Sequence, residues 1–283
     1  MDKTKFEEGI KEPLERILLS LRKNNMILWA GSGLSLYMDN KDENKYPSVN
    51  DLCVKIFNSA KDEDKKELER YKASLPDISS EYCRLYKREM LIDILKDCFD
   101  TRPNFEPTTH NRIFEIKQID TIITTNYDRL FEFAFSNKTN VIVGDAYKRL
   151  GKWMTDLYKI HGDTSIPDSI IITREDYDGF SKTQDKILWN IISALLASKS
   201  ILFVGYSLED KNVQDMLEKY MRLVSTTDNE FFIVTPKPLH NNTKIRLKEI
   251  CNKITYIPRK GEELFEYIKT KSVMNQFMML RTL

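Results

Sequence analysis

Met26-Ile-Leu-Trp-Ala-Gly-Ser-Gly-Leu-Ser35 is the stretch of sequence that decides the fold. Its mostly apolar first four residues predict a buried strand, and the small residues from Ala30 to Gly33 predict a tight turn directly after it. Such a turn lets the phosphates of a ligand approach the backbone, where N–H groups favour negative charge. The turn is therefore a candidate pyrophosphate site. A plain strand-to-helix turn is the alternative, because Leu36 stands where Gly-x-Gly-x-x-Gly has its third glycine.

Strands alternate with helices along the rest of the chain. Further strands are predicted where apolar residues run together, at Asp120–Thr125, Asn140–Gly144, Leu157–Ile160, Ile170–Thr173, Ile201–Val204, Phe231–Val234 and Ile254–Ile257. Continuous apolar strands, unlike strands of alternating polarity, indicate a parallel sheet that is covered on both faces. We therefore expect an α/β fold, with a Rossmann-like parallel sheet between two layers of helices.

A small helical insert is predicted at about residues 51–100, after the first strand. Ser48 and Asp51 have the spacing of a capping box at its start, and Thr173 and Asp176 repeat that spacing later in the chain. The last helix is expected over Gly261–Lys269. The weakly patterned tail, residues 271–283, receives no role.

The composition limits the classes of function. Among 283 residues, 44 Lys and Arg nearly balance 43 Asp and Glu, so no overall basic field attracts nucleic acid. Neither a signal peptide nor a membrane-spanning run is present, and we expect a soluble, cytoplasmic protein with no membrane and no direct nucleic-acid partner. The cysteines, Cys53, Cys83, Cys98 and Cys251, form no Cys-x-x-Cys pair, which argues against a zinc ribbon or a disulfide framework.

Small or polar residues follow five of the predicted strands. They are Gly31–Ser35, Thr124–Asp128, His161–Asp163, Gly205–Ser207 and Thr235. In open parallel sheets, ligands bind beyond the carboxyl ends of the strands. We therefore expect these segments to meet at one edge of the sheet and to form the binding site.

Two side chains at this edge are candidates for chemistry. His161 ends a strand before a glycine, where a histidine is well placed as a general base, and the alternative is a histidine that only bonds the turn. Asn126 can hold ribose hydroxyls or a water through its amide, and the alternative is a left-handed turn residue. His110 and His240 are expected at the surface.

Asp128 and Asp210 are weaker candidates. Thr125 and Asp128 have the spacing of a capping box, as do Ser207 and Asp210, so each acid has a structural explanation as the start of a helix.

Four motifs in this order resemble the NAD-site motifs of the sirtuin family. They are Gly31-Ser-Gly-Leu-Ser35, Thr124-Thr-Asn-Tyr-Asp128, Lys159-Ile-His-Gly162 and Phe203-Val-Gly-Tyr-Ser-Leu208, within Met26–Pro236. The variants seen here resemble the bacterial sirtuin-like branch of antiphage defence proteins, which is known for hydrolysing NAD. The chain departs from sirtuin deacylases in lacking a zinc ribbon and in having Thr125 in place of a glutamine. The Gly-Ile-Pro-Asp-Phe-Arg segment of those deacylases is also replaced by a longer polar region, in which Pro47–Asp51 is the nearest counterpart. These departures put an acyl-lysine groove in doubt.

The resemblance implies roles for single residues. It implies a sirtuin-like NAD-binding domain over residues 1–270, NAD+ as the substrate and no metal. Asn126 and His161 would be the catalytic pair. The NAD-binding residues would be Ala30, Gly31, Ser32, Gly33, Ser35, Thr125, Asp128, Gly205, Tyr206 and Ser207.

The function expected from this resemblance is an NAD+ glycohydrolase. It would cleave the nicotinamide–ribose bond to give nicotinamide and ADP-ribose, as an effector of antiviral defence by NAD+ depletion. A protein deacylase and a module that senses NAD or another nucleotide without consuming it are the alternatives. The family implies a homo-oligomer and a defence partner, namely an ATPase, an Argonaute-like protein or a sensor.

Overall fold

The computed structural model gives the fold of most of the chain. It describes residues 6–36, 46–99, 107–136, 138–144, 146–147, 155–182, 187–206, 218, 221–222, 228–236, 241–250 and 253–280.

One eight-stranded sheet forms the centre of the molecule, with the strand order β4-β3-β5-β2-β1-β6-β7-β8. All strands except β4 run parallel to their neighbours, and β4 pairs antiparallel with β3. The strands are β1 (Met26–Ala30), β2 (Thr121–Thr124), β3 (Thr139–Val143), β4 (Ala146–Tyr147), β5 (Thr155–Lys159), β6 (Ser200–Val204), β7 (Phe231–Val234) and β8 (Ile254–Ile257). The predicted Rossmann-like parallel sheet is confirmed.

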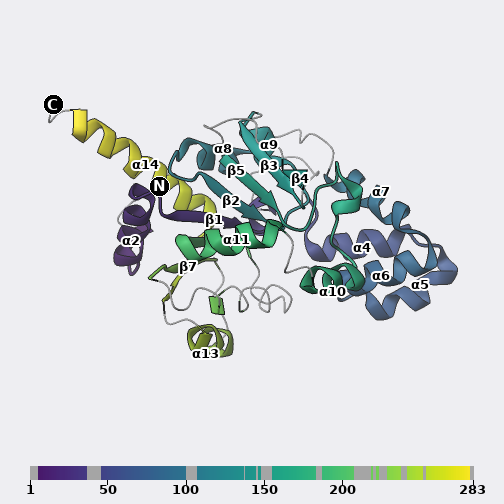
Figure 1. Ribbon diagram of the computed structural model, residues 1–283. Coiled ribbons are helices and arrows are strands. Elements are labelled where there is room, and N and C mark those ends of the chain that lie inside the picture. Colours follow the sequence, from purple (N-terminus) through teal and green to yellow (C-terminus); the bar gives the residue numbers. More distant parts are fainter. Residues whose placement is uncertain are drawn as a thin grey trace.

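Helices cover both faces of this sheet (Figure 1). Successive residues of a strand point to opposite faces, so Leu28 packs in one core while Ile27 and Trp29 pack in the other. The first core contains residues of α2 (Lys11–Arg22), α8 (Thr108–Glu115), α9 (Leu130–Ala134) and α14 (Gly261–Leu280). The second contains residues of α11 (Ile187–Ser198) and α13 (Asn241–Ile250). The central strands β1, β6 and β7 are mostly apolar because both of their faces are buried.

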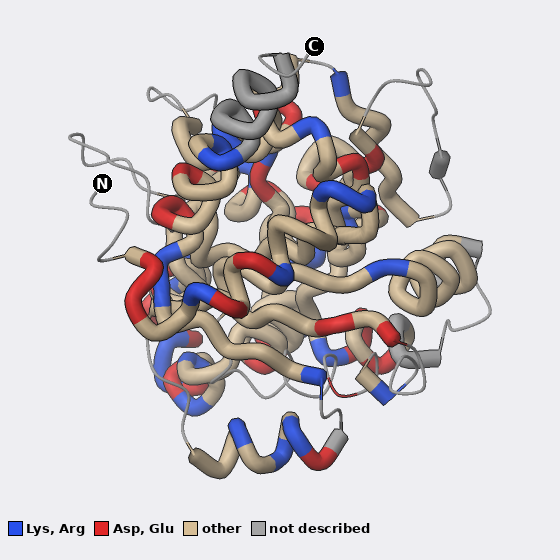
Figure 2. Tube along the Cα trace, turned by 90° about the vertical axis from the view of Figure 1, so that its left-hand side faces the viewer, with Lys and Arg blue, Asp and Glu red and all other residues tan. Residues whose placement is uncertain are grey.

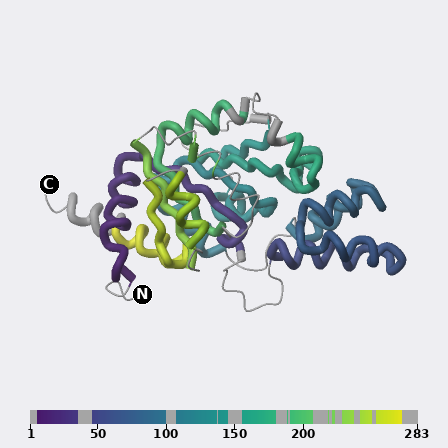
Figure 3. Tube along the Cα trace, turned by 90° about the horizontal axis from the view of Figure 1, so that it is seen from below, coloured from purple at the N-terminus to yellow at the C-terminus, as the bar shows by residue number. Residues whose placement is uncertain are grey.

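The chain between β1 and β2 folds into a group of helices with a core of its own. These helices are α4 (Val49–Ser59), α5 (Asp62–Leu68), the 3-10 turn η1 (Glu69–Tyr71), α6 (Leu75–Leu85) and α7 (Arg88–Phe99). They gather at one end of the molecule, and α2 and α14 lie at the other (Figures 1 and 3). The capping box predicted for Ser48 and Asp51 is present at the start of α4.

Two predicted elements differ from the structure. The predicted strand Ile170–Thr173 is absent, and this segment bonds the turn after β5 instead, with Ile171 N–H donating to the His161 carbonyl at 3.0 Å. The last helix does not end at Lys269 but continues to Leu280 as α14. By contrast, the capping box of Thr173 and Asp176 forms, at the start of α10 (Arg174–Lys182).

Charged residues of both signs are interleaved along the chain in the view of Figure 2. This agrees with the nearly balanced composition. None of the helices in the described part of the chain is both long enough and apolar enough to cross a bilayer.

Three glycines bring the ends of β1 and β6 into backbone contact. A Cβ atom on Gly31 or Gly33 would lie 2.7 Å from the Gly205 carbonyl oxygen, and one on Gly205 would lie 2.4 Å from the Leu34 nitrogen. Gly205 also has a φ of +79°, a left-handed conformation that strains other residues. The glycines are needed here because no side chain fits between the two strand ends.

We predict that Gly205→Ala lowers the free energy of unfolding by about 2 kcal/mol or more, through left-handed strain and overlap with Leu34. Urea denaturation measures this change. The control is Gly179→Ala in α10, where an added Cβ meets nothing within 4 Å and φ is not left-handed. That helical replacement should stabilise the protein by about 0.5 to 1 kcal/mol. Equal effects of the two substitutions would contradict the packing argument.

Candidate active site at the carboxyl edge of the sheet

The register of the strands places the candidate residues along one edge. Ala30 of β1 pairs with Thr124 of β2 and Val204 of β6, and Thr124 pairs with Lys159 of β5. The segments that follow these paired residues therefore start from the same level of the sheet. They contain the glycine turn, Asn126, His161 and Gly205, so the predicted meeting of strand ends is confirmed.

Asn126 is buried, and its side chain is oriented by a relay of hydrogen bonds. Its Nδ2 donates to Ser35 Oγ at 3.2 Å, and Ser35 Oγ donates to Asp128 Oδ2 at 2.8 Å. The only hydroxyl proton of Ser35 goes to the carboxylate, so Ser35 Oγ must accept its second hydrogen bond from Asn126. The Asn126 atom that faces Ser35 is therefore the amide nitrogen and not the amide oxygen. Asn126 Oδ1 is then a buried acceptor with no hydrogen-bond partner within the described structure.

Asp128 holds the other end of this relay. Its Oδ1 accepts from Leu130 N–H at 3.1 Å, at the first turn of α9. The predicted capping box with Thr125 is wrong, because the Thr125 hydroxyl bonds the Tyr206 hydroxyl at 3.1 Å instead. Asp128 thus joins the helix start to Ser35, and through Ser35 to Asn126.

His161 follows β5 and is half-buried. Its ring lies edge-on to the ring of Tyr177, with 5.3 Å between the centroids. Burial lowers the pKa of the His161 imidazole to about 4. The ring is therefore neutral at pH 7 and able to accept a proton.

Gly162 forces the turn after His161. Its φ is +90°, and a Cβ atom there would lie 2.3 Å from the Ser169 carbonyl oxygen. Only glycine fits this position without strain. The turn sends the chain back along the sheet edge, where the Ile171 carbonyl accepts from the Tyr127 hydroxyl at 2.6 Å.

Tyr206 closes the edge between β1 and β2. Its hydroxyl donates to the Ala30 carbonyl at 3.2 Å and contacts the Thr125 hydroxyl, and burial raises its pKa. Ala30 and Tyr206 are both buried. These residues join the ends of β1, β2 and β6. Their role in binding NAD stays a prediction.

The glycine turn uses much of its own hydrogen-bonding capacity. Four backbone N–H groups between Gly31 and Ser35 donate to carbonyl oxygens at 2.7 to 3.0 Å, two of them to Val204 and Gly205 and two inside the turn. The glycines thus serve the packing of β1 against β6. Ser32 at the tip is exposed, and the role of this turn as a pyrophosphate site stays a prediction.

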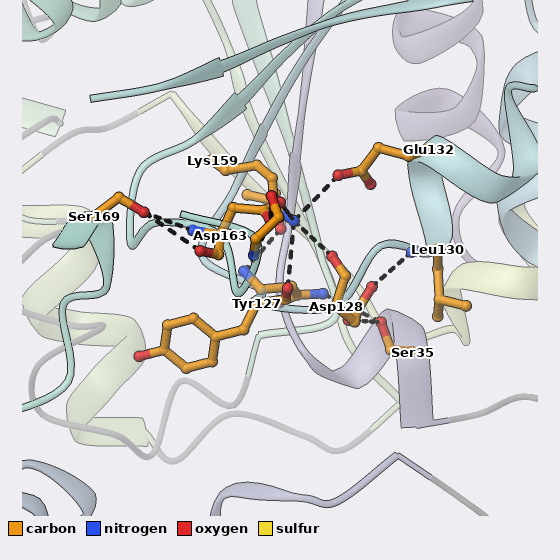
Figure 4. Close-up of polar contacts among 11 residues, drawn as sticks. Ser35, Tyr127, Asp128, Leu130, Glu132, Lys159, Asp163 and Ser169 are labelled. Atoms are coloured by element: carbon orange, nitrogen blue, oxygen red, sulfur yellow. Dashed lines mark hydrogen bonds and ion pairs between the residues drawn. The ribbon is translucent and has the colours of Figure 1, made fainter. Parts of the chain in front are cut away.

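A buried lysine contacts Tyr127 and Asp128 after β2 and Asp163 after β5 (Figure 4). Lys159 Nζ donates to the carbonyl oxygens of Tyr127 (3.3 Å) and Asp128 (2.8 Å), and it pairs with Glu132 (3.2 Å) and Asp163. Burial disfavours the ammonium, but the carboxylates outweigh burial and raise the pKa of Lys159. The same pairing holds the pKa of Asp163 low against its burial, whereas burial raises the pKa of Glu132.

His110 is buried, which corrects the prediction that it lies at the surface. Its ring packs edge-on against Phe131, with 4.5 Å between the centroids. Burial lowers its pKa to about 4, and neither ring nitrogen has a hydrogen-bond partner within the described structure. His240 lies outside the described residues.

The profile of the SIR2-like domain family matches residues 120–256, a range that includes Asn126, Lys159 and His161. The chain carries a SIR2-like domain.

Curated relatives of this sirtuin-like chain come from bacteria. An NAD(+) hydrolase ThsA of Acinetobacter baumannii (strain 532279) is 30% identical over 223 residues, covering 76% of this chain and 43% of the relative. Defense-associated sirtuin 2 of Bacillus subtilis is 27% identical over 255 residues, covering 85% and 24%. The chain thus spans less than half the length of these two relatives. A solved structure from work on Sir2 enzymes has a TM-score of 0.47 and 13% identity, covering 96% of this chain and 100% of that one.

The carboxyl edge of the sheet brings together most of the predicted site residues. Ser35, Thr125, Asn126, Asp128, Gly205 and Tyr206 lie at one edge with Ala30 and the glycine turn. Ser207 lies outside the described residues. The ion cluster of Lys159, Glu132 and Asp163 is a feature that the sequence motifs do not predict. A charged residue inside an apolar run is the feature of the sequence that could have indicated this cluster. Lys159 lies between Tyr158 and Ile160, and Glu132 lies between Phe131 and Phe133.

We predict that Ser35→Ala lowers the free energy of unfolding by about 2 kcal/mol, because it leaves both Asn126 Nδ2 and Asp128 Oδ2 without their buried partner. Denaturation in urea provides the measurement. Ser59→Ala is the matched control, since the Ser59 hydroxyl bonds only the Ile56 carbonyl at the end of α4. The relay would be refuted if both variants lost the same small amount of stability.

Proposed function

We propose that the chain hydrolyses NAD+ at the bond between nicotinamide and ribose. The products would be nicotinamide and ADP-ribose. Two relatives support this assignment through their names, which are those of an NAD(+) hydrolase and a defence-associated sirtuin.

The observation that carries the proposal is the oriented amide of Asn126. Its Oδ1 is a buried acceptor with no protein partner in the described part of the chain, and Ser35 and Asp128 prevent the amide from turning over. A buried acceptor of this kind is costly unless a ligand or water satisfies it. A ribose hydroxyl, or the water that attacks the ribose, fits as the donor.

The reaction requires the protein to orient the ribose and the attacking water and to accept one proton. When the C1′–N1 bond breaks, its electron pair stays on nicotinamide and neutralises the positive ring, so no strong general acid is needed. The ribose becomes oxocarbenium-like, a water oxygen bonds C1′, and this water loses a proton. Asn126 would orient the ribose or the water, and the neutral His161 would accept the proton.

The chain's biological role in this proposal is that of an effector in antiviral defence. Depletion of NAD+ would stop the infected cell, so the activity must be controlled. We propose a homo-oligomer and a defence partner, namely an ATPase, an Argonaute-like protein or a sensor. The relatives, which are more than twice as long as the matched part of this chain, are consistent with control by further domains.

We predict that the purified chain releases nicotinamide from NAD+, and that Asn126→Ala and His161→Ala each lower this rate by about 100-fold or more. Chromatography of the products gives the rate, and thermal unfolding shows that the variants are folded. The control is Asn140→Ala, which removes a buried asparagine that bonds Asp156 within the sheet, away from the carboxyl edge. Binding of NAD+ without any release would contradict hydrolysis and favour a sensing module.

We predict an unusually acid-tolerant activity. His161 must be neutral to accept a proton, and its pKa of about 4 keeps it neutral until the solution approaches that pH. The ratio kcat/KM should stay constant from pH 8 to about 5 and fall as the pH falls towards 4, whereas an ordinary histidine would lose half its activity near pH 6.5. Samples held at low pH and then assayed at neutral pH separate protonation from unfolding. A half-maximal rate near pH 6.5 would exclude this assignment of His161.

A further inference from the structure

Lys159 contacts both of the turns that hold the proposed catalytic pair. It contacts the turn after β2 through the carbonyl oxygens of Tyr127 and Asp128, the two residues that follow Asn126. Through Asp163 it contacts the turn after β5, two residues beyond His161. One ammonium group thus joins two segments of the sheet edge (Figure 4).

The ammonium is fully committed to these contacts. The Lys159 side chain is 0% exposed, and its three protons face four oxygens, two from carbonyl groups and two from carboxylates. Asp163 is held in turn, because its Oδ1 accepts from Ser165 N–H at 2.8 Å and its own N–H donates to Ser169 Oγ at 3.0 Å. The lysine therefore has one defined position, set from both sides.

Stability alone is a poor explanation for this arrangement. Desolvation of a buried ion pair offsets most of its attraction, and an apolar replacement of both charges is often neutral or stabilising. A buried pair is better explained by the geometry it imposes. Here it imposes the distance between the Asn126 turn and the His161 turn, which a reaction depending on orientation needs.

We propose that Lys159 is a positioning residue, which Asp163 and Glu132 hold in place so that it fixes the Asn126 turn relative to the His161 turn. The proposal rests on the proposed function for its effect on turnover. Its structural content, the placement of His161, is independent of the reaction. Lys159 touches carbonyl groups and carboxylates beneath the edge, and it acts on the substrate only through Asn126 and His161.

The test is the double variant Lys159→Met/Asp163→Asn. It removes one charge of each sign and keeps side chains of similar size, and the remaining Glu132 accepts a proton readily because burial raises its pKa. The matched control is Lys199→Met/Asp120→Asn, which removes an ion pair of 2.8 Å at the opposite, amino end of the strands. Both variants change the same residue types and remove one charged side chain of each sign.

Turnover provides the first readout. We expect the site variant to stay folded and to lose about 100-fold in kcat with little change in KM for NAD+, because binding survives while orientation is lost. The control should keep the wild-type rate. A site variant that is as active as the control would overturn the proposal. So would a site variant that no longer folds, because the cluster would then serve stability.

Proton NMR provides a readout that does not depend on catalysis. The chain has only 3 histidines, so the His161 resonance is identified by its loss in His161→Ala. In the wild type and the control, His161 should titrate near its low pKa of about 4. In the site variant the freed turn should admit water and move this pKa towards 6.5. If the wild type releases no nicotinamide, the proposed function fails, and an unchanged His161 titration would separately refute the positioning role.

Discussion

The backbone contact between the end of β1 and the end of β6 is the constraint on which the site depends. β1 lies at the centre of the sheet, with β2 on one side and β6 on the other. The chain builds one half of the sheet after β1 and then returns to its other side, which makes the β1–β6 junction the switch point where such sheets bind ligands. Gly31, Gly33 and Gly205 allow the two ends to meet without side chains between them. The other strand ends take their positions from this junction through the continuous register.

Polar groups beneath the edge turn this meeting of strands into a site of fixed geometry. The Ser35 hydroxyl crosses from the β1 side to Asp128 on the β2 side, and the Lys159 ammonium crosses from β5 to the same turn. The helical group between β1 and β2 contributes as well, because its core includes Tyr127, Ile170 and Ile172. Arg88 of α7 adds a polar contact, to Asp176 at 2.9 Å and to the Ile170 carbonyl at 2.6 Å. The turns that carry Asn126 and His161 are thus braced from three directions.

The sequence predicts the sheet and its edge well, because apolar strands and glycine turns are local patterns. The partners of buried polar groups are not local. Ser35 and Asp128 are 93 residues apart, and no spacing rule links them. The spacing of Thr125 and Asp128 suggests a capping box, yet the Thr125 hydroxyl finds Tyr206 across the sheet. His110 is a polar residue of α8, yet it lies on the inner face of this helix against Phe131. Ile170–Thr173 has the apolar pattern of a strand because Ile170 and Ile172 pack in the core of the helical group.

The central position of β1 also governs the order in which the chain can assemble. Ala30 contacts Thr124, 94 residues later, and Tyr206, 176 residues later, whereas the helices α4 to α7 pack chiefly on one another. During synthesis the helices α4 to α7 can pack on one another soon after they emerge, whereas β1 stays unpaired until β2 and β6 have been made. Contacts of such long sequence separation form slowly, and an unpaired apolar strand is open to pairing with other chains. The strand that organises the finished sheet is therefore the segment of the nascent chain most in need of protection.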